Sequence, residues 1–210
     1  ECLIAVGERF HDDAKAEETY RAMLAQPDTE LLGLHGLFRI AMRKGQEDEA
    51  LRLAARAQEL RPKTAWPAEA LFDLRVGRHE WDEAQSALKR QMRLRLIGAD
   101  AARRKRAVVL TAAARDADRA GDDEAALTRS LDAATLAPAL VPAAALAARK
   151  LTQAGRLWKA QEVVEAAWAL APHPDLASAY AAIHPTDDAE TRARRFGTLV
   201  RFNPDHVESR

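Results

Sequence analysis

The sequence has little of what disulfide-linked proteins, cysteine-based metal sites and membrane spans require. Its single cysteine, Cys2, cannot form an internal disulfide and excludes a cysteine-rich zinc site. No stretch reaches the ~18–20 apolar residues that a bilayer-spanning helix needs. Because the chain begins at Glu1 rather than at a methionine, we expect a piece of a longer protein, and these absences describe this piece alone.

Aromatic residues are also scarce, and neither sign of charge is in excess. Aromatics make up 5% of the chain, and Lys+Arg and Asp+Glu number 32 each, so the net charge is zero. A general binder of nucleic acid or of anionic membranes should be basic, and this balance argues against both. Apolar residues are plentiful at 48% and are mostly alanine and leucine, which favour closely packed helices.

Sequence signatures of catalysis are absent as well. The chain has no glycine-rich phosphate loop after a strand, no nucleophile elbow and no His-Glu-x-x-His helix. The aspartate pairs at 12–13, 122–123 and 187–188 fall at predicted helix starts, where capping explains them. We therefore expect no enzyme, no catalytic residues, no bound cofactor and no metal site. His35 could ligate haem iron, and the alternative is a solvated or packed groove histidine.

What the chain does have is an internal period of 34 residues. This interval separates Gly121 from Gly155 and Pro138 from Pro172. Several alanines repeat with the same spacing, and an upstream copy has the same internal offsets: Gly45, Ala50, Ala57 and Pro62. Such a period is typical of repeat proteins, in which each copy buries its apolar face against its neighbours.

Each copy is predicted to form two antiparallel helices. The first ends at a glycine that can adopt a left-handed conformation, and the second ends at a proline. Full copies are expected at 31–64, 65–98, 107–140 and 141–174, with partial copies at 1–30 and 175–210. Residues 99–106 should extend the first helix of the third copy backward. The expected fold is one all-α repeat domain, 1–210, a right-handed superhelical solenoid.

This pattern resembles the tetratricopeptide repeat, although the first-helix tryptophan and tyrosine of that motif are missing. A narrower resemblance, to the HemY family of proteobacterial inner-membrane proteins linked to haem biosynthesis, spans nearly the whole chain. It rests on five segments in the same order: Leu31-Leu32-Gly33-Leu34-His35-Gly36-Leu37, residues 65–74, residues 103–111, His173-Pro174-Asp175-Leu176-Ala177 and Asn203-Pro204-Asp205-His206.

The HemY resemblance implies several properties of the longer protein. An N-terminal hairpin of two helices, absent from this chain, would lie in the inner membrane. The repeat domain would then lie at the membrane surface on the cytoplasmic side. Its role would be accessory, organising late enzymes of protohaem synthesis, and the family provides no established catalytic residues to transfer to this chain.

The first helices of the copies are expected to line a concave, protein-binding groove. The predicted groove residues are His35, Arg39, Met42, Arg43, Trp66, Glu69, Asp73, Thr111, Arg115, Asp118, Arg119 and Arg149. Several arginines with a tryptophan suit a peptide segment with acidic groups, and porphyrin carboxylates less specifically. Three other tryptophans, Trp81, Trp158 and Trp168, lie in second helices and are expected to pack between copies.

Two further interpretations remain open. The basic run 103–106 is either a solvated helix face with ion pairs or a contact for anionic lipids or an acidic partner. The function is expected to be that of a non-catalytic scaffold for haem-synthesis proteins. The alternatives are a haem or porphyrin carrier and a peptide-binding repeat module unrelated to haem.

Overall fold

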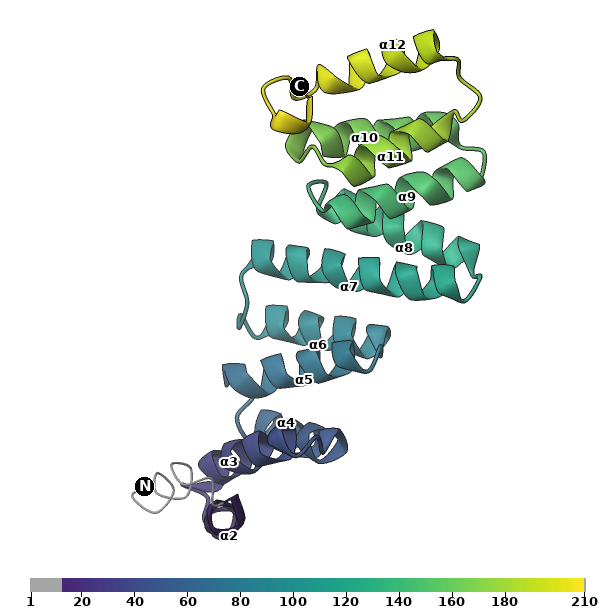
Figure 1. The fold of residues 1–210 in the computed structure, drawn as a ribbon. Helices are drawn as coiled ribbons and strands as arrows, with labels where there is room; N and C mark the ends of the chain where they lie inside the picture. Colours follow the sequence, from purple (N-terminus) through teal and green to yellow (C-terminus); the bar gives the residue numbers. More distant parts are fainter. Residues whose placement is uncertain (1–12, 210) are drawn as a thin grey trace. The chain divides into compact units, whose positions relative to one another are not determined.

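The computed structural model describes residues 13–209, and all regular secondary structure in that range is helical. Figure 1 shows the helices following one another in pairs along the chain. The chain divides into two compact units, residues 1–98 and residues 99–210, and we describe each by itself. The expected all-α fold built from antiparallel helix pairs is confirmed. Cys2, His11 and Asp12 lie outside the described residues.

Residues 13–98, the described part of the first unit, contain five helices, each packed on the next along the chain. They are α2 (Asp13–Met23), α3 (Glu30–Arg43), α4 (Glu47–Leu60), α5 (Ala65–Gly77) and α6 (Trp81–Arg93). Its core is formed by leucines and alanines from α3, α4 and α5, including the buried Leu34, Leu53 and Leu74. The helices α3/α4 and α5/α6 lie where the sequence predicts two copies of the repeat.

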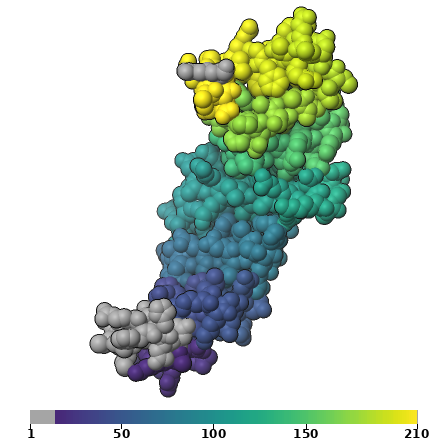
Figure 2. Space-filling view, viewed as in Figure 1, coloured from purple at the N-terminus to yellow at the C-terminus, as the bar shows by residue number. Residues whose placement is uncertain are grey.

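The second unit begins with the longest helix of the described chain, α7, which has 21 residues. Its helices are α7 (Ala99–Arg119), α8 (Asp123–Leu136), α9 (Val141–Gln153), α10 (Leu157–Leu170), α11 (Pro174–Ile183), α12 (Ala189–Val200) and a 3₁₀ turn, η1 (Val207–Ser209). Residues 99–106 are the first turns of α7. Consecutive helices from α7 to α11 contact one another, and their side chains fill the spaces between them in Figure 2.

Three first helices end at the glycines that the period predicts. Gly45, Gly121 and Gly155 have φ angles of +66°, +77° and +72°, in the left-handed region. After α3, the Gln46 N–H donates to the Ala41 carbonyl at 2.9 Å, and the Gly45 N–H donates to Met42. This is the Schellman arrangement, which satisfies carbonyls at a helix end and turns the chain toward the next helix.

The copy at 65–98 makes the same turn after its first helix without glycine, and it makes a different turn after its second helix. His79 takes the place of the glycine after α5 with φ +61°, and the Glu80 N–H still donates to the Arg75 carbonyl at 3.0 Å. After α6, Arg95 has φ +58° where other copies have a proline nearby. A side chain in this region costs about 1–2 kcal/mol relative to the right-handed form. This copy therefore keeps the first turn of the repeat, and each of its two left-handed residues costs some stability.

Small residues allow the two helices of a pair to approach closely. The alanine at the same place in each second helix is fully buried: Ala50, Ala84, Ala126 and Ala160. Two glycines do the same between α2 and α3. A methyl group on Gly33 would come within 2.7 Å of the Tyr20 carbonyl oxygen, and one on Gly36 would overlap the Tyr20 ring. The Leu31–Leu37 segment therefore has a packing role against α2.

The last helices of the second unit are joined by aromatic and charged side chains. The Tyr180 hydroxyl donates to Glu165 at 2.9 Å, while Arg195 lies over the Tyr180 ring and pairs with Asp187. Trp168 is 2% exposed, which confirms its predicted packing. Trp158 is 76% exposed, so the same prediction was wrong there: it lies at the start of α10, where its side chain faces solvent.

Trp81 is half-buried at the start of α6, with its ring centre 5.0 Å from that of His79.

Of the aspartate pairs, the two described ones cap helices as expected. Asp122 accepts from the Ala125 N–H at 3.0 Å, and Asp188 accepts from the Thr191 N–H at 2.7 Å. Between residues 13 and 209, every helix is either too short or too polar to cross a membrane.

Candidate protein-binding groove

A groove of about 440 Å³ lies between α3 and α5, the first helices of two successive copies. Five of the predicted groove residues line it: His35, Met42, Trp66, Glu69 and Asp73. The spacing explains why they gather there. Residues three, four and seven apart share one face of a helix, and this relation joins the two α3 residues and the three α5 residues. We call this surface the α3/α5 groove.

The apolar part of the α3/α5 groove is aromatic. The ring centre of Trp66 lies 4.6 Å from that of His35 and 5.3 Å from that of Phe38. Met42 is 44% exposed at the same surface. A half-buried tryptophan with an adaptable methionine beside it is the type of surface that anchors a partner side chain. Phe38 is absent from our predicted set, although its place three residues after His35 puts it on the same helix face.

The polar part of the α3/α5 groove is acidic. Three carboxylates line it, those of Glu47, Glu69 and Asp73, and no lysine or arginine does so among the described lining residues. Glu47 is paired with Arg78 at 3.3 Å. The predicted Arg39 and Arg43 are exposed on α3 but do not line this groove. The arginines that suggested a preference for acidic groups are therefore absent from this lining, whose charge has the opposite sign.

The remaining predicted residues belong to the second unit, and the structure does not gather them into a pocket. Arg115 and Arg149 are exposed on α7 and α9. Arg119 forms an ion pair with Asp116 at 2.8 Å, one turn earlier on the same helix. None of these lines the two pockets described for this unit. A continuous groove through all copies would join the two units, and it stays a prediction.

Thr111 requires a correction. It is 6% exposed, and its hydroxyl donates to the Ala107 carbonyl at 2.7 Å, one turn back along α7. A threonine with this internal bond is part of the packed face of the helix. The misplacement follows from the register, since one position along a helix rotates a side chain by about 100°.

Asp118 is engaged by a lysine that we did not predict. Lys150 of α9 is 5% exposed, and its ammonium group contacts Asp118 of α7 and lies 2.8 Å from Asp123 of α8. These ion-pair hydrogen bonds, that to Asp118 first, raise the pKa of Lys150 above its ordinary value. The cluster joins three helices of the second unit. A buried lysine is rare unless it is paired, as Lys150 is here.

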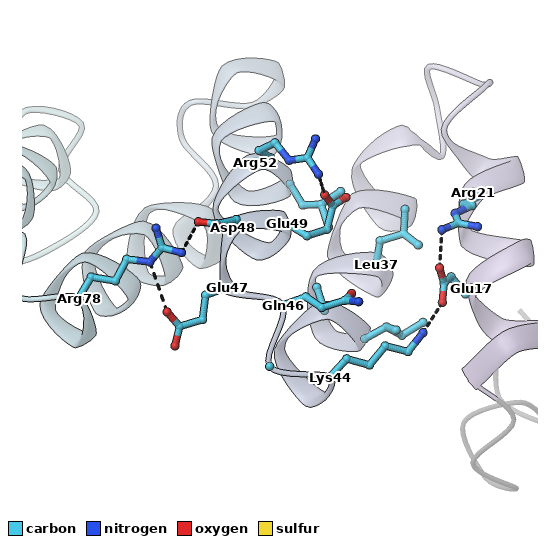
Figure 3. A pocket seen from close by; sticks show the side chains of 14 residues that line it. Glu17, Arg21, Leu37, Lys44, Gln46, Glu47, Asp48, Glu49, Arg52 and Arg78 are labelled. Carbon is cyan, nitrogen blue, oxygen red and sulfur yellow. Dashed lines mark hydrogen bonds and ion pairs between the residues drawn. The ribbon is translucent and has the colours of Figure 1, made fainter.

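A larger pocket of about 860 Å³ lies in the first unit, and eight of its 14 lining residues are charged and paired with one another (Figure 3). Glu17 of α2 lies between Arg21 and Lys44, with an Oε2–Nζ distance of 2.6 Å to Lys44. Arg78 reaches Asp48 at 2.5 Å. Since these charges already have partners across the helices, we attribute the pocket to the connection between copies rather than to a ligand.

The basic run 103–106 lies near the start of α7, which begins at Ala99. Arg103 pairs with Asp100 at 2.7 Å, which supports the interpretation of a solvated helix face with local ion pairs. Arg103 and Arg104 also line a pocket of about 550 Å³ with an apolar floor that includes Leu136 and the 61% exposed Leu170. A contact with an anionic partner or lipid therefore stays open. Among residues 13–209, no cluster of three metal-ligating side chains forms.

The helix pairs have a fold of the tetratricopeptide-repeat type. No protein-family model matches the chain, and no curated sequence is detectably similar to it. A solved structure of a MamA double mutant from RS-1 is 17% identical, with coverage of 83% of this chain and 94% of that chain and a TM-score of 0.50. At this identity the likeness shows the fold alone.

Two further solved structures are similar at lower scores. YrrB, described as a TPR protein with an unusual peptide-binding site, is 15% identical, with coverage of 92% of this chain and 97% of that chain and a TM-score of 0.48. PilW, described as a widely conserved type IV pilus biogenesis factor, is 15% identical, with coverage of 99% and 93% and a TM-score of 0.43. The HemY family stays a prediction from the sequence segments.

Proposed function

We propose that this chain is a non-catalytic repeat module that binds a segment of a partner protein in the α3/α5 groove. The observation that carries the proposal is the open aromatic surface of Trp66, Phe38 and Met42 between two first helices. The cores beneath these helices are already filled by leucine and alanine side chains. Trp66 and Phe38 pack against this core with part of each side chain, and the part that stays accessible faces the groove. An aromatic anchor in a concave site is typical of recognition.

We further propose that the partners are late enzymes of protohaem synthesis at the bacterial inner membrane. The HemY resemblance supports these partners. We propose from the same resemblance that the domain lies on the cytoplasmic side of the membrane and is attached through a segment that precedes this chain. The resemblance includes residues 65–74, which form most of α5 and contain Trp66, Glu69 and Asp73. The segment that resembles the family is thus one that also forms the candidate site.

A haem or porphyrin carrier is the second candidate, and one observation favours it. His35 lies against the Trp66 ring, so a potential axial ligand is present beside aromatic side chains. The carboxylates of Glu69 and Asp73 oppose it, because they would repel the carboxylates of a porphyrin. A stoichiometric shift of the haem Soret band that His35→Ala abolishes would favour the carrier over the scaffold.

The scaffold is tested by capture of candidate partners from solubilised membranes on three forms of the chain. They are the wild type, Trp66→Ala in the groove, and Trp158→Ala as a control, since Trp158 is 76% exposed and does not line the groove. We expect late haem-synthesis enzymes on the wild type and the control, and none on Trp66→Ala. Equal retention on all three forms would remove the site from the α3/α5 groove. Retention of other proteins alone would contradict the haem assignment.

A further inference from the structure

We propose that the α3/α5 groove selects a partner segment that carries a lysine or arginine side chain next to an apolar one. This inference rests on the proposed function, and it specifies the chemistry of the ligand. The charge of this segment is opposite to that of the acidic segment that the arginines of the first helices suggest. The groove's shape, its unpaired carboxylates and its aromatic floor each contribute to the argument.

The positions on α5 place aromatic and acidic groups together. Trp66, Glu69 and Asp73 are three and four residues apart, so the two carboxylates follow the indole along one face of the helix. A basic side chain that lies over the indole can direct its charged end toward the carboxylates. A cation over a tryptophan ring is attracted by the ring electrons, and carboxylates strengthen hydrogen bonds from a charged donor.

The charge of Glu69 and Asp73 is available to a partner. Elsewhere in the first unit, carboxylates such as Glu17, Glu30 and Glu49 are paired with a lysine or arginine. Glu69 and Asp73 are exposed and have no such ion pair among the described residues. They give the groove lining an excess of negative charge, while the third carboxylate, that of Glu47, is paired with Arg78. An acidic segment would be repelled, and a basic one would be attracted.

The apolar side of the groove requires an apolar neighbour beside the basic side chain. Phe38 and Met42 of α3 face Ala70 and Leu74 of α5 across the groove. A volume of about 440 Å³ is near the lower end of the ~300–1,000 Å³ range of ligand pockets. It therefore suits a few side chains of an extended or helical segment rather than a large planar ring.

The experiment compares three fluorescein-labelled peptides of identical length with a leucine-containing frame. Their two central variable positions are both lysine, both glutamine or both glutamate. Fluorescence anisotropy measures their affinities for the full chain and for two charge-matched variants. One is Glu69→Gln with Asp73→Asn in the groove, and the control is Glu18→Gln with Glu83→Gln on exposed positions of α2 and α6. Each variant removes two carboxylates without truncating a packed side chain.

We expect the lysine peptide to bind the wild type and the control about tenfold more tightly than the glutamine peptide. The groove variant should erase this difference, and raised salt should weaken the lysine peptide more than the glutamine peptide. Equal binding of all three peptides, or tighter binding of the glutamate peptide, would overturn the charge preference.

The control for the groove itself is Trp66→Ala. If all peptides bind equally and Trp66→Ala abolishes their binding, the proposed function stands and the basic preference is wrong. If no peptide binds, or if Trp66→Ala leaves binding unchanged, both the preference and the groove are wrong for these segments. Circular dichroism of each variant verifies that the helices are intact.

Discussion

Replacing Lys150 by methionine tests how the second unit is held together. The substitution keeps an unbranched apolar side chain and removes the ammonium group that joins α7, α8 and α9. Lys150 is 5% exposed, so methionine can occupy most of the same space. The principal loss is the pair of charge-assisted hydrogen bonds to Asp118 and Asp123.

The expected cost follows from the exposure of the partners. A hydrogen bond to a charged group contributes about 1.5–3 kcal/mol net when both groups are held well. The side chains of Asp118 and Asp123 are 31% and 78% exposed, so both carboxylates regain water when the lysine is removed. We therefore expect a total loss of about 2 kcal/mol in the free energy of unfolding, below the ~3–5 kcal/mol of a fully buried pair.

Urea unfolding followed by circular dichroism at neutral pH measures the loss. Lys159→Met is the matched control, because Lys159 pairs with Glu162 one turn away with about half of each side chain exposed. Such a surface pair contributes about 0–0.5 kcal/mol. If Lys150→Met costs no more than Lys159→Met, the ion-pair cluster does not stabilise the unit and the reasoning is refuted.

The pH dependence of the same comparison has a definite sign. The folded-state pKa of Lys150 is raised above the ordinary lysine value of 10.5, first by the hydrogen bond to Asp118 and then by that to Asp123. A lysine whose pKa is raised on folding stabilises the fold fully at pH values below its pKa in the unfolded chain. This stabilisation is lost as the pH rises through its pKa in the folded chain. The advantage of the wild type over Lys150→Met should be constant from pH 6 to 9 and decrease above about 10.5.

Three further predictions concern stability and are measured by thermal and urea unfolding. His79→Gly should raise the free energy of unfolding by about 1 kcal/mol, because glycine adopts φ +61° without strain; no gain would mean that the turn is not strained. Gly36→Ala should lower it by about 1–3 kcal/mol, because the new methyl group overlaps the Tyr20 ring; a neutral result would mean that α2 is loosely held. Tyr180→Phe should cost about 1 kcal/mol by removing the hydrogen bond to Glu165. Burial and then Glu165 raise the pKa of Tyr180 to about 12, so the wild type should lose this contribution between pH 10 and 12, and the variant should not.

The fold could be predicted because the repeat encodes it redundantly. The 34-residue interval fixes a left-handed glycine, a buried alanine and a closing proline in each good copy, and the structure places Gly45, Gly121 and Gly155 at that turn. The copy at 65–98 could be placed by interval alone, since His79 replaces the glycine. What the interval could not show is that His79 adopts the same backbone conformation, because the hydrogen bonds of the turn enforce it.

The site could be predicted in part, and the limit is the rotation of each helix. On α3 and α5, the register places five of the predicted side chains in one groove. On α7, it misplaced Thr111 by pointing a packed side chain toward solvent. The register also placed Arg39 in the groove, but Arg39 lies outside the α3/α5 lining. Helix position does not tell which side chains are already paired either, as Asp118 of α7 is with Lys150.

In the proposed function, the α3/α5 groove binds the partner through Trp66. The most direct test is the dissociation constant of a captured partner protein for the wild type, Trp66→Ala and Trp158→Ala, measured by isothermal titration calorimetry. A central aromatic anchor contributes about 2 kcal/mol or more, so Trp66→Ala should weaken binding by about thirtyfold or more. Trp158→Ala should leave binding unchanged. Equal affinities for all three forms would contradict the account.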